Sequence, residues 1–352
     1  MNTQNNEIRW KGKILWSLLF IIIAAASIYA VIMQSKSFSL QAFGAFVAGA
    51  NPLYLCAAAV MMFCFIFFEG LAIIVICRAF GYRIRGYNGF AYSATDLYFS
   101  AITPSATGGQ PACAYFMVKD GIPGVVTTVA LLINLMVYSF SIVTIGAVVF
   151  VLRPSVFANF NTLSRILIIL GAVVQGAFVV FFYLLVRHER LLSGICRGTV
   201  RLLGKLHLLH NIAEKEKKLD AVFEDYRERA ALITGHKKTI LKAFLFNLIQ
   251  RSSQIAVSVF CFLATGGTWD RAFDIFATQS YAVLGSNCVP IPGAMGVSDY
   301  LMLDGFGQWM GEEAATSLEL LSRSVSFYAC ILICGIVALL KFIQIKRRKN
   351  VC

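Results

Sequence analysis

Charged side chains are scarce in this chain of 352 residues, where Asp, Glu, Lys and Arg together make up 14% of the sequence. Soluble globular proteins carry about a quarter of charged residues. Hydrophobic residues instead reach 58%, and the mean hydropathy is +0.73. Several apolar runs exceed the roughly 18 residues that are needed to cross a bilayer. The composition excludes a soluble domain and predicts an all-α, polytopic membrane protein.

The chain also lacks the residue patterns of metal binding and covalent catalysis. Its ten cysteines include no CxxC pair, and Cys330 and Cys334, one helical turn apart, are interpreted as small packing residues. The four histidines fall in one polar loop without partners at metal-site spacing. We therefore expect no metal and no cofactor. The net charge of +13 does not indicate nucleic acid, because the basic residues flank hydrophobic runs.

Proline is rare, and four of the seven prolines lie in two short stretches, residues 103–111 and 289–296. Proline and glycine oppose a continuous helix, and irregular backbone inside a membrane survives only where protein or a water-filled cavity satisfies its polar groups. We predict two re-entrant, broken-helix hairpins, the first hairpin over Phe90–Lys119 and the second hairpin over Ala272–Phe306. Matched breaks of this kind indicate a transport site.

The remaining apolar runs predict about six full transmembrane helices. The first run has no Ala-x-Ala cleavage site, so we expect it to be a retained helix and not a signal peptide. The expected spans are 14–33, 52–77, 124–152, 166–186, 239–264 and 322–342. The resulting division is a first membrane repeat (1–152), a span that opens the second repeat (153–186), a basic segment (187–238), and the rest of the second repeat with a basic tail (239–352).

The polar loop over 187–242 carries thirteen Lys and Arg, which predicts that it is cytoplasmic, together with both termini. The chain then forms two units of opposite orientation, an inverted-topology repeat in the cytoplasmic membrane. Apolar residues in the loop recur every three or four positions, so we predict an amphipathic helical hairpin that lies on the anionic membrane surface or against the bundle. A solvated charged linker is the alternative.

Ionisable residues inside the spans are the first candidates for a site, because such residues are costly in a membrane unless they are paired or hydrated. Glu69 and Arg251 either form a structural pair or line a polar cavity that holds a lipid headgroup. Asp96 and Asp299, one on each hairpin, either meet a cationic headgroup amine or have an ordinary role as helix caps or solvent-exposed residues.

Polar and small residues at the two breaks are the second group of candidates. The side chains of Thr103, Ser105, Thr107 and Gln110 either bind phosphate near helix N-termini or satisfy the freed backbone. Gly108 and Gly109 serve either backbone packing or ligand contact. In the second break we assign Pro290, Pro292 and Gly293 to the same site.

The first break, Pro104–Pro111, with the aromatic residue that follows it and Gly121, resembles the signature of the lysylphosphatidylglycerol synthase transmembrane (flippase-like) family. Pro290–Gly296 with Asp299 resembles the second signature, which is usually Pro-x-Pro-Gly-Gly-x-Gly followed by Glu. Ala294 and Asp299 depart from that pattern. The resemblance covers nearly the whole chain.

The resemblance implies a role in lipid movement. In the multiple-peptide-resistance factor, the membrane part moves lysyl-phosphatidylglycerol between leaflets, and a soluble domain makes that lipid, which confers resistance to cationic peptides. We do not expect the soluble domain in this chain. The first hypothesis is therefore a translocator of an anionic or aminoacylated phospholipid. A phosphatidylglycerol lysyltransferase and a secondary transporter of a soluble solute are the alternatives. The sequence leaves a homo-oligomer open.

Overall fold

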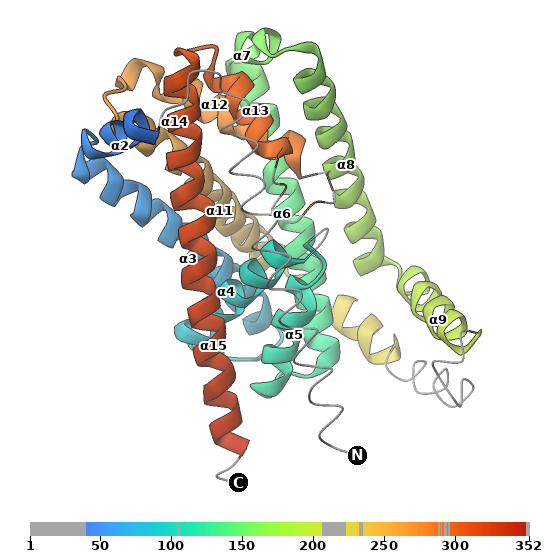
Figure 1. Ribbon diagram of the computed structural model, residues 1–352. Coiled ribbons are helices and arrows are strands. Elements are labelled where there is room, and N and C mark those ends of the chain that lie inside the picture. The colour runs from blue at the N-terminus through green and yellow to red at the C-terminus, as the bar shows by residue number, and fades with distance from the viewer. Residues whose placement is uncertain are drawn as a thin grey trace.

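The computed structural model describes residues 40–103, 106–205, 223–231, 235–287, 289, 291, 294 and 296–349. All regular elements in these ranges are helices, and Figure 1 shows them as one bundle. In chain order the helices are α2 (Leu40–Ala48), α3 (Pro52–Ala79), α4 (Gly86–Ile102), α5 (Gly109–Lys119), α6 (Gly124–Leu152), α7 (Pro154–Asn159), α8 (Thr162–Arg187), α9 (Glu189–Lys205), α11 (Lys237–Ala264), α12 (Trp269–Ser286), α13 (Val297–Phe306), α14 (Glu312–Arg323), the π-helical η3 (Ser324–Ala329) and α15 (Cys330–Lys349).

Four helices in the described ranges are long and apolar enough to cross a membrane, which confirms an all-α polytopic membrane protein. They are α3, α6, α8 and the continuous run Glu312–Arg347. The predicted span 14–33 lies outside the described residues. Pro52 begins α3 as expected, because it takes the first helical position while the Asn51 side chain accepts a hydrogen bond from the Leu53 amide at 2.9 Å.

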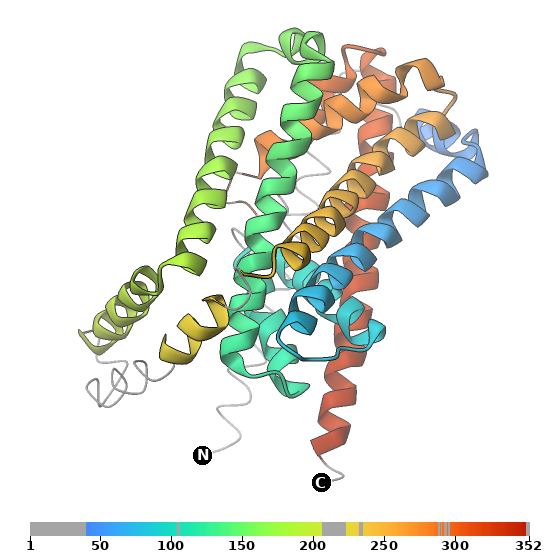
Figure 2. The ribbon, with the colours of Figure 1, turned by 180° about the vertical axis from the view of Figure 1, so that it is seen from behind.

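Helices α3 and α11 form the centre of the bundle, and they cross it side by side in Figure 2. Helix α11 is more polar than the four apolar spans, yet most polar side chains in its middle are buried. For example, Asn247 donates to Asn134 of α6 at 3.1 Å. Such a helix is tolerated because other helices cover it. Helix α8 is the opposite case, since only 17% of its most apolar window is buried, and its exposed face fits contact with lipid.

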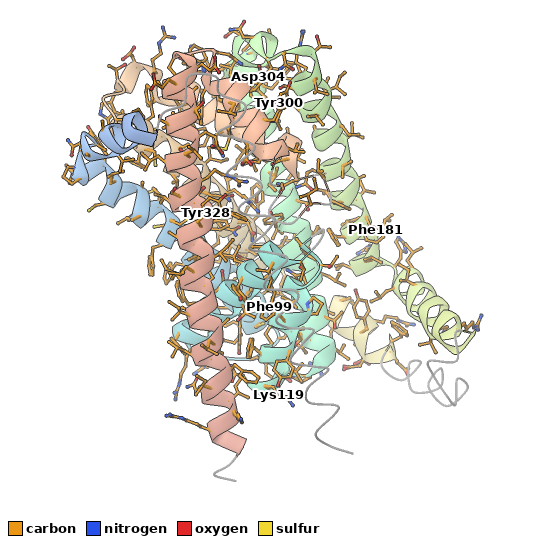
Figure 3. The ribbon with its side chains drawn as sticks, in the orientation of Figure 1. Phe99, Lys119, Phe181, Tyr300, Asp304 and Tyr328 are labelled. Atoms are coloured by element: carbon orange, nitrogen blue, oxygen red, sulfur yellow. The ribbon has the colours of Figure 1, made fainter. Side chains whose placement is uncertain are left out.

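The two predicted hairpins are present as two pairs of short helices. The first hairpin comprises α4 and α5, with 17 and 11 residues. These lengths correspond to roughly 25 and 16 Å, so neither helix crosses a bilayer alone. The second hairpin comprises α12 and α13, which lie near the opposite end of the bundle in Figure 1. Figure 3 marks the two ends with Lys119 of the first hairpin and Asp304 of the second.

The last helix differs from the prediction at both of its ends. The predicted span 322–342 is part of a helical run that begins at Glu312 and ends at Lys349. The π-helical segment η3 interrupts this run at Ser324–Ala329. The helix begins before the predicted span because the polar side chains Glu319 and Arg323 near that boundary are buried by contacts with other helices.

The basic loop contributes two described helical segments, α9 and residues 223–231, while 206–222 and 232–234 lie outside the described ranges. Phe223 and Tyr226 pack into the bundle, and the Tyr226 hydroxyl donates to the Leu185 carbonyl at 2.9 Å. The segment 223–231 therefore lies against the end of α8. The full amphipathic hairpin stays a prediction.

Candidate functional site

The tip of the first hairpin is held together by its own polar side chains. The Thr103 hydroxyl donates to the Phe99 carbonyl at 2.7 Å and accepts from the Gly108 amide at 2.8 Å. Thr103 therefore satisfies backbone groups that the break frees. Thr107 is exposed, and Ser105 lies outside the described residues.

Asp96 joins the two arms of the first hairpin. Its carboxylate accepts from Gln110 Nε2 at 2.7 Å and from Ser100 Oγ at 3.3 Å, and its side chain is buried. Gly109 lets the arms approach this closely, because a Cβ at that position would lie 2.0 Å from both Asp96 Oδ1 and Ser100 Oγ. Among the two alternatives for Gly109, the geometry favours packing.

Glu69 lies next to Asp96 in the same buried polar cluster. Its Oε2 accepts from Ser93 Oγ at 3.0 Å and from Gln250 Nε2 at 3.1 Å. The cluster thus connects α3, the first hairpin and α11 at the centre of the bundle.

Arg251 does not form the direct ion pair with Glu69 that was one alternative. Its guanidinium donates to Gln254 Oε1 and stacks over the Tyr138 ring at 4.1 Å from the centroid, while Phe65 lies on another side. Its Nε is buried without a hydrogen-bond acceptor in the described part of the chain. A buried guanidinium that lacks a carboxylate within 4.0 Å among the described residues is an attractive partner for an anion.

Asp299 has both a capping and an ion-pair role. Its Oδ2 accepts from the Gly296 amide at 2.8 Å at the start of α13, and its Oδ1 lies 2.6 Å from Arg323 Nε. Glu319 lies 3.8 Å from the same nitrogen, one turn earlier in α14. Arg323 is therefore held in place from one side, while its Nη2 has no acceptor among the described residues.

A cavity of about 400 Å³ lies between the tips of the two hairpins. Arg251 and Arg323 both line it, with Gln254, Gln279 and Asn287, and no carboxylate belongs to the described lining. Ser100 is the side chain through which the Asp96 cluster reaches the cavity. The volume lies within the range of roughly 300–1,000 Å³ that is typical of ligand pockets.

The two hairpin tips present similar backbones to this cavity. Ala106 and Ala294 both line it, and they adopt the left-handed conformation with φ of 53° and 50°. Glycine favours that conformation, which explains why a glycine is usual in the second signature at the position that Ala294 occupies here. Pro290, Pro292 and Gly293 lie outside the described residues.

Phe178 of α8 and Phe327 of η3 close the cavity on its apolar sides. Figure 3 shows their neighbours Phe181 and Tyr328 on either side of the middle of the bundle. The cavity therefore extends from the buried arginines to α8, whose outer face is apolar and exposed.

Residues 14–334 match the family described as lysylphosphatidylglycerol synthase TM region. The chain belongs to this family. No curated protein matches it. Membership in the synthase TM family indicates a lipid-related function in a membrane, and it agrees with the two broken hairpins that enclose the cavity.

The sequence of this family member predicted Arg251 as a candidate site residue, but not Arg323, which lines the same cavity, or Glu319 beside it. Of the predicted site residues that the structure describes, only Arg251 lines the cavity; Glu69, Asp96, Gln110 and Asp299 lie behind its surface. The sequence did hold a sign of this pair: Glu319 and Arg323 are four residues apart among leucines, and this spacing places both on one helix face, where they can pair.

A second buried cation on the last helix was also missed. Lys341, eighteen residues after Arg323, is fully buried, and its Nζ lies 2.6 Å from Asp120 Oδ2 and 3.0 Å from Asn88 Oδ1. The Tyr92 hydroxyl donates to the same Asp120 oxygen at 2.6 Å. The helical run α14–α15 thus makes an ion pair with each hairpin, and η3 lies between the two pairs at the cavity.

Proposed function

We propose that the protein translocates a phospholipid between leaflets, with the lipid phosphate in the cavity between the hairpin tips. The observation that carries the proposal is the pair Arg251 and Arg323, two buried arginines that line one cavity without a lining carboxylate in the described part of the chain. Guanidinium groups bind phosphate oxygens through charge-assisted hydrogen bonds. The nitrogens Arg251 Nε and Arg323 Nη2 supply donors that lack an acceptor among the described residues.

The position of the cavity also supports a lipid over a soluble solute. Phe178 lies on the lipid-facing helix α8 and is half-exposed, although it also lines the cavity. A headgroup can thus lie at the arginines while its acyl chains lie along the exposed apolar face of α8, in contact with the bilayer. Lysyl-phosphatidylglycerol is the lipid that the family description suggests, and its phosphate is the part that the two arginines fit.

The two hairpins supply a means of exposing one site to either leaflet. Each comes from one end of the bundle, and their tips face the same cavity. Movement of one hairpin with its half of the bundle would open the cavity towards one membrane surface, as in transporters with inverted repeats. The acidic cluster of Glu69 and Asp96 lies behind the cavity wall, where the lining residue Ser100 donates to Asp96.

A reconstituted flipping assay tests the proposal. Vesicles with acyl-labelled fluorescent phosphatidylglycerol are treated with a membrane-impermeant quencher, and the rate at which inner-leaflet lipid becomes quenchable is measured. A charge-assisted hydrogen bond contributes about 1.5–3 kcal/mol, so Arg251→Gln should slow flipping roughly tenfold or more. Arg271→Gln is the matched control, because this exposed arginine pairs with Asp274 away from the cavity. Flipping that is absent from the unaltered protein, or equal in both variants, would refute the proposal.

A further inference from the structure

A second cavity, of about 360 Å³, lies at the surface of the bundle. Its described lining consists of Arg83, Arg85, Tyr87, Asn88 and Gln344, and we call it the basic pocket. The first four residues belong to the link between α3 and α4 and to the start of α4, and Gln344 belongs to α15. The basic pocket shares no lining residue with the cavity between the hairpin tips.

The basic pocket gathers positive charge without a counter-ion in the described part of the chain. Arg83 and Arg85 are exposed, and neither forms an ion pair with a described residue. Helix α4 begins at Gly86 without a side-chain cap, so its positive end adds to the field of the two arginines. Two adjacent, unpaired guanidiniums at one cavity favour a phosphate group.

Gln344 adds a need for a hydrogen-bond donor, which a phosphate group alone does not supply. Its Oε1 is buried without a donor among the described residues, although Gln344 lines the cavity. A phosphate diester offers acceptors only. Gln344 is only half-buried, and rotation of its amide into the pocket would let Oε1 accept from a hydroxyl or amine beyond the phosphate.

The surroundings of the basic pocket fit a lipid and not a free phosphate compound. Leu339, Leu340 and Ile343 of α15 are exposed apolar side chains that lie within two helical turns of Gln344. An acyl chain can lie along this face while its headgroup reaches the arginines. Basic pockets at the headgroup level between membrane helices commonly bind anionic lipids.

We propose that the basic pocket is a second phospholipid site, which binds an anionic headgroup with a hydroxyl or amine donor beyond its phosphate. The acyl chain of this lipid lies on the outer face of α15. The site is separate from translocation in the central cavity, and the inference does not rest on that function. Asn88 connects it to the buried ion pair, because the same side chain accepts from Lys341 Nζ.

Photo-crosslinking of the full chain in liposomes tests this site. Phosphatidylglycerol with a diazirine in its acyl chain is irradiated with the protein, and labelled peptides are mapped by mass spectrometry. We expect label on the peptide that contains Leu339 and Ile343. The double variant Arg83→Gln/Arg85→Gln loses at least one charge-assisted contact with the headgroup, so the amount of label should fall about tenfold or more. Both replaced residues are exposed, so folding should be unaffected.

Two control variants and one further test make the outcome decisive. Arg78→Gln removes an exposed charge in the last turn of α3, outside the pocket, and it should leave the label unchanged. Arg251→Gln, in the central cavity, should also leave the label unchanged. Gln344→Leu should abolish the preference for phosphatidylglycerol over phosphatidic acid. Label that persists in the double arginine variant, or that phosphatidylcholine displaces as well as phosphatidylglycerol does, would overturn the proposal. Displacement by glycerol phosphate at equal concentration would assign the pocket to a free phosphate compound instead.

Discussion

Gly109→Ala should destabilise the protein strongly, although it adds a single methyl group. The new Cβ would lie 2.0 Å from Asp96 Oδ1 and Ser100 Oγ, and 2.6 Å from the Asp96 carbonyl oxygen. Overpacking costs about 1–3 kcal/mol, and rotation of Asp96 away from Gln110 loses a charged hydrogen bond worth about 1.5–3 kcal/mol. The gain in helix propensity returns at most about 1 kcal/mol. The expected net loss is about 2–5 kcal/mol.

Thermal melting in detergent, followed by fluorescence-detected size exclusion, measures this loss. Gly176→Ala is the matched control, because this glycine of α8 has no heavy atom within 4 Å of an added Cβ. The control should melt at or slightly above the temperature of the unaltered protein. Ser100→Ala in the Gly109→Ala background removes one of the two closest atoms and should restore part of the stability. Equal melting temperatures for Gly109→Ala and Gly176→Ala would refute the close packing of the hairpin arms.

Three further predictions follow from the last helix and the second hairpin. Lys341→Met leaves the buried Asp120 carboxylate without its cation and should lower the free energy of unfolding by about 3–5 kcal/mol in a denaturation series. Lys341→Met combined with Asp120→Asn should recover much of that loss. Unchanged stability in the single variant would contradict the ion pair. Ala294→Gly removes the strain of a left-handed alanine and should raise stability by about 1 kcal/mol, which a lower melting temperature would contradict. Cysteines at Gln308 and Lys119 should react with an impermeant reagent from opposite sides of the membrane, and labelling from one side would exclude hairpins of opposite orientation.

The broken hairpins could be predicted from sequence because proline and glycine act locally. Pro104 and Pro111 oppose a continuous helix whatever surrounds them, so the break between α4 and α5 could be placed within a few residues. The apolar spans were predictable for a similar reason, since their length and composition suffice to identify them.

The partners of the buried charges could not be predicted, because they depend on contacts between distant segments. Glu69 was recognised as unusual, yet its partners proved to be Ser93 of α4 and Gln250 of α11. Arg251 likewise proved to stack on the Tyr138 ring of α6. Lys341 lies at the end of the predicted span 322–342, next to the basic tail, and nothing in the sequence indicates that Asp120 and Asn88 bury it completely. Composition does not distinguish a snorkelling lysine from a buried one.

Lipids that co-purify with the protein test the central claim most directly, namely that the cavity between the hairpin tips binds a lipid phosphate. Mass spectrometry of the protein purified in mild detergent should find an anionic phospholipid enriched over the host membrane. Arg251→Gln and Arg323→Gln should each lose that enrichment, while Arg271→Gln should keep it, because only the first two arginines line the cavity. The same lipid in the same amount from all four proteins would show that the two arginines do not bind its phosphate and would contradict the account.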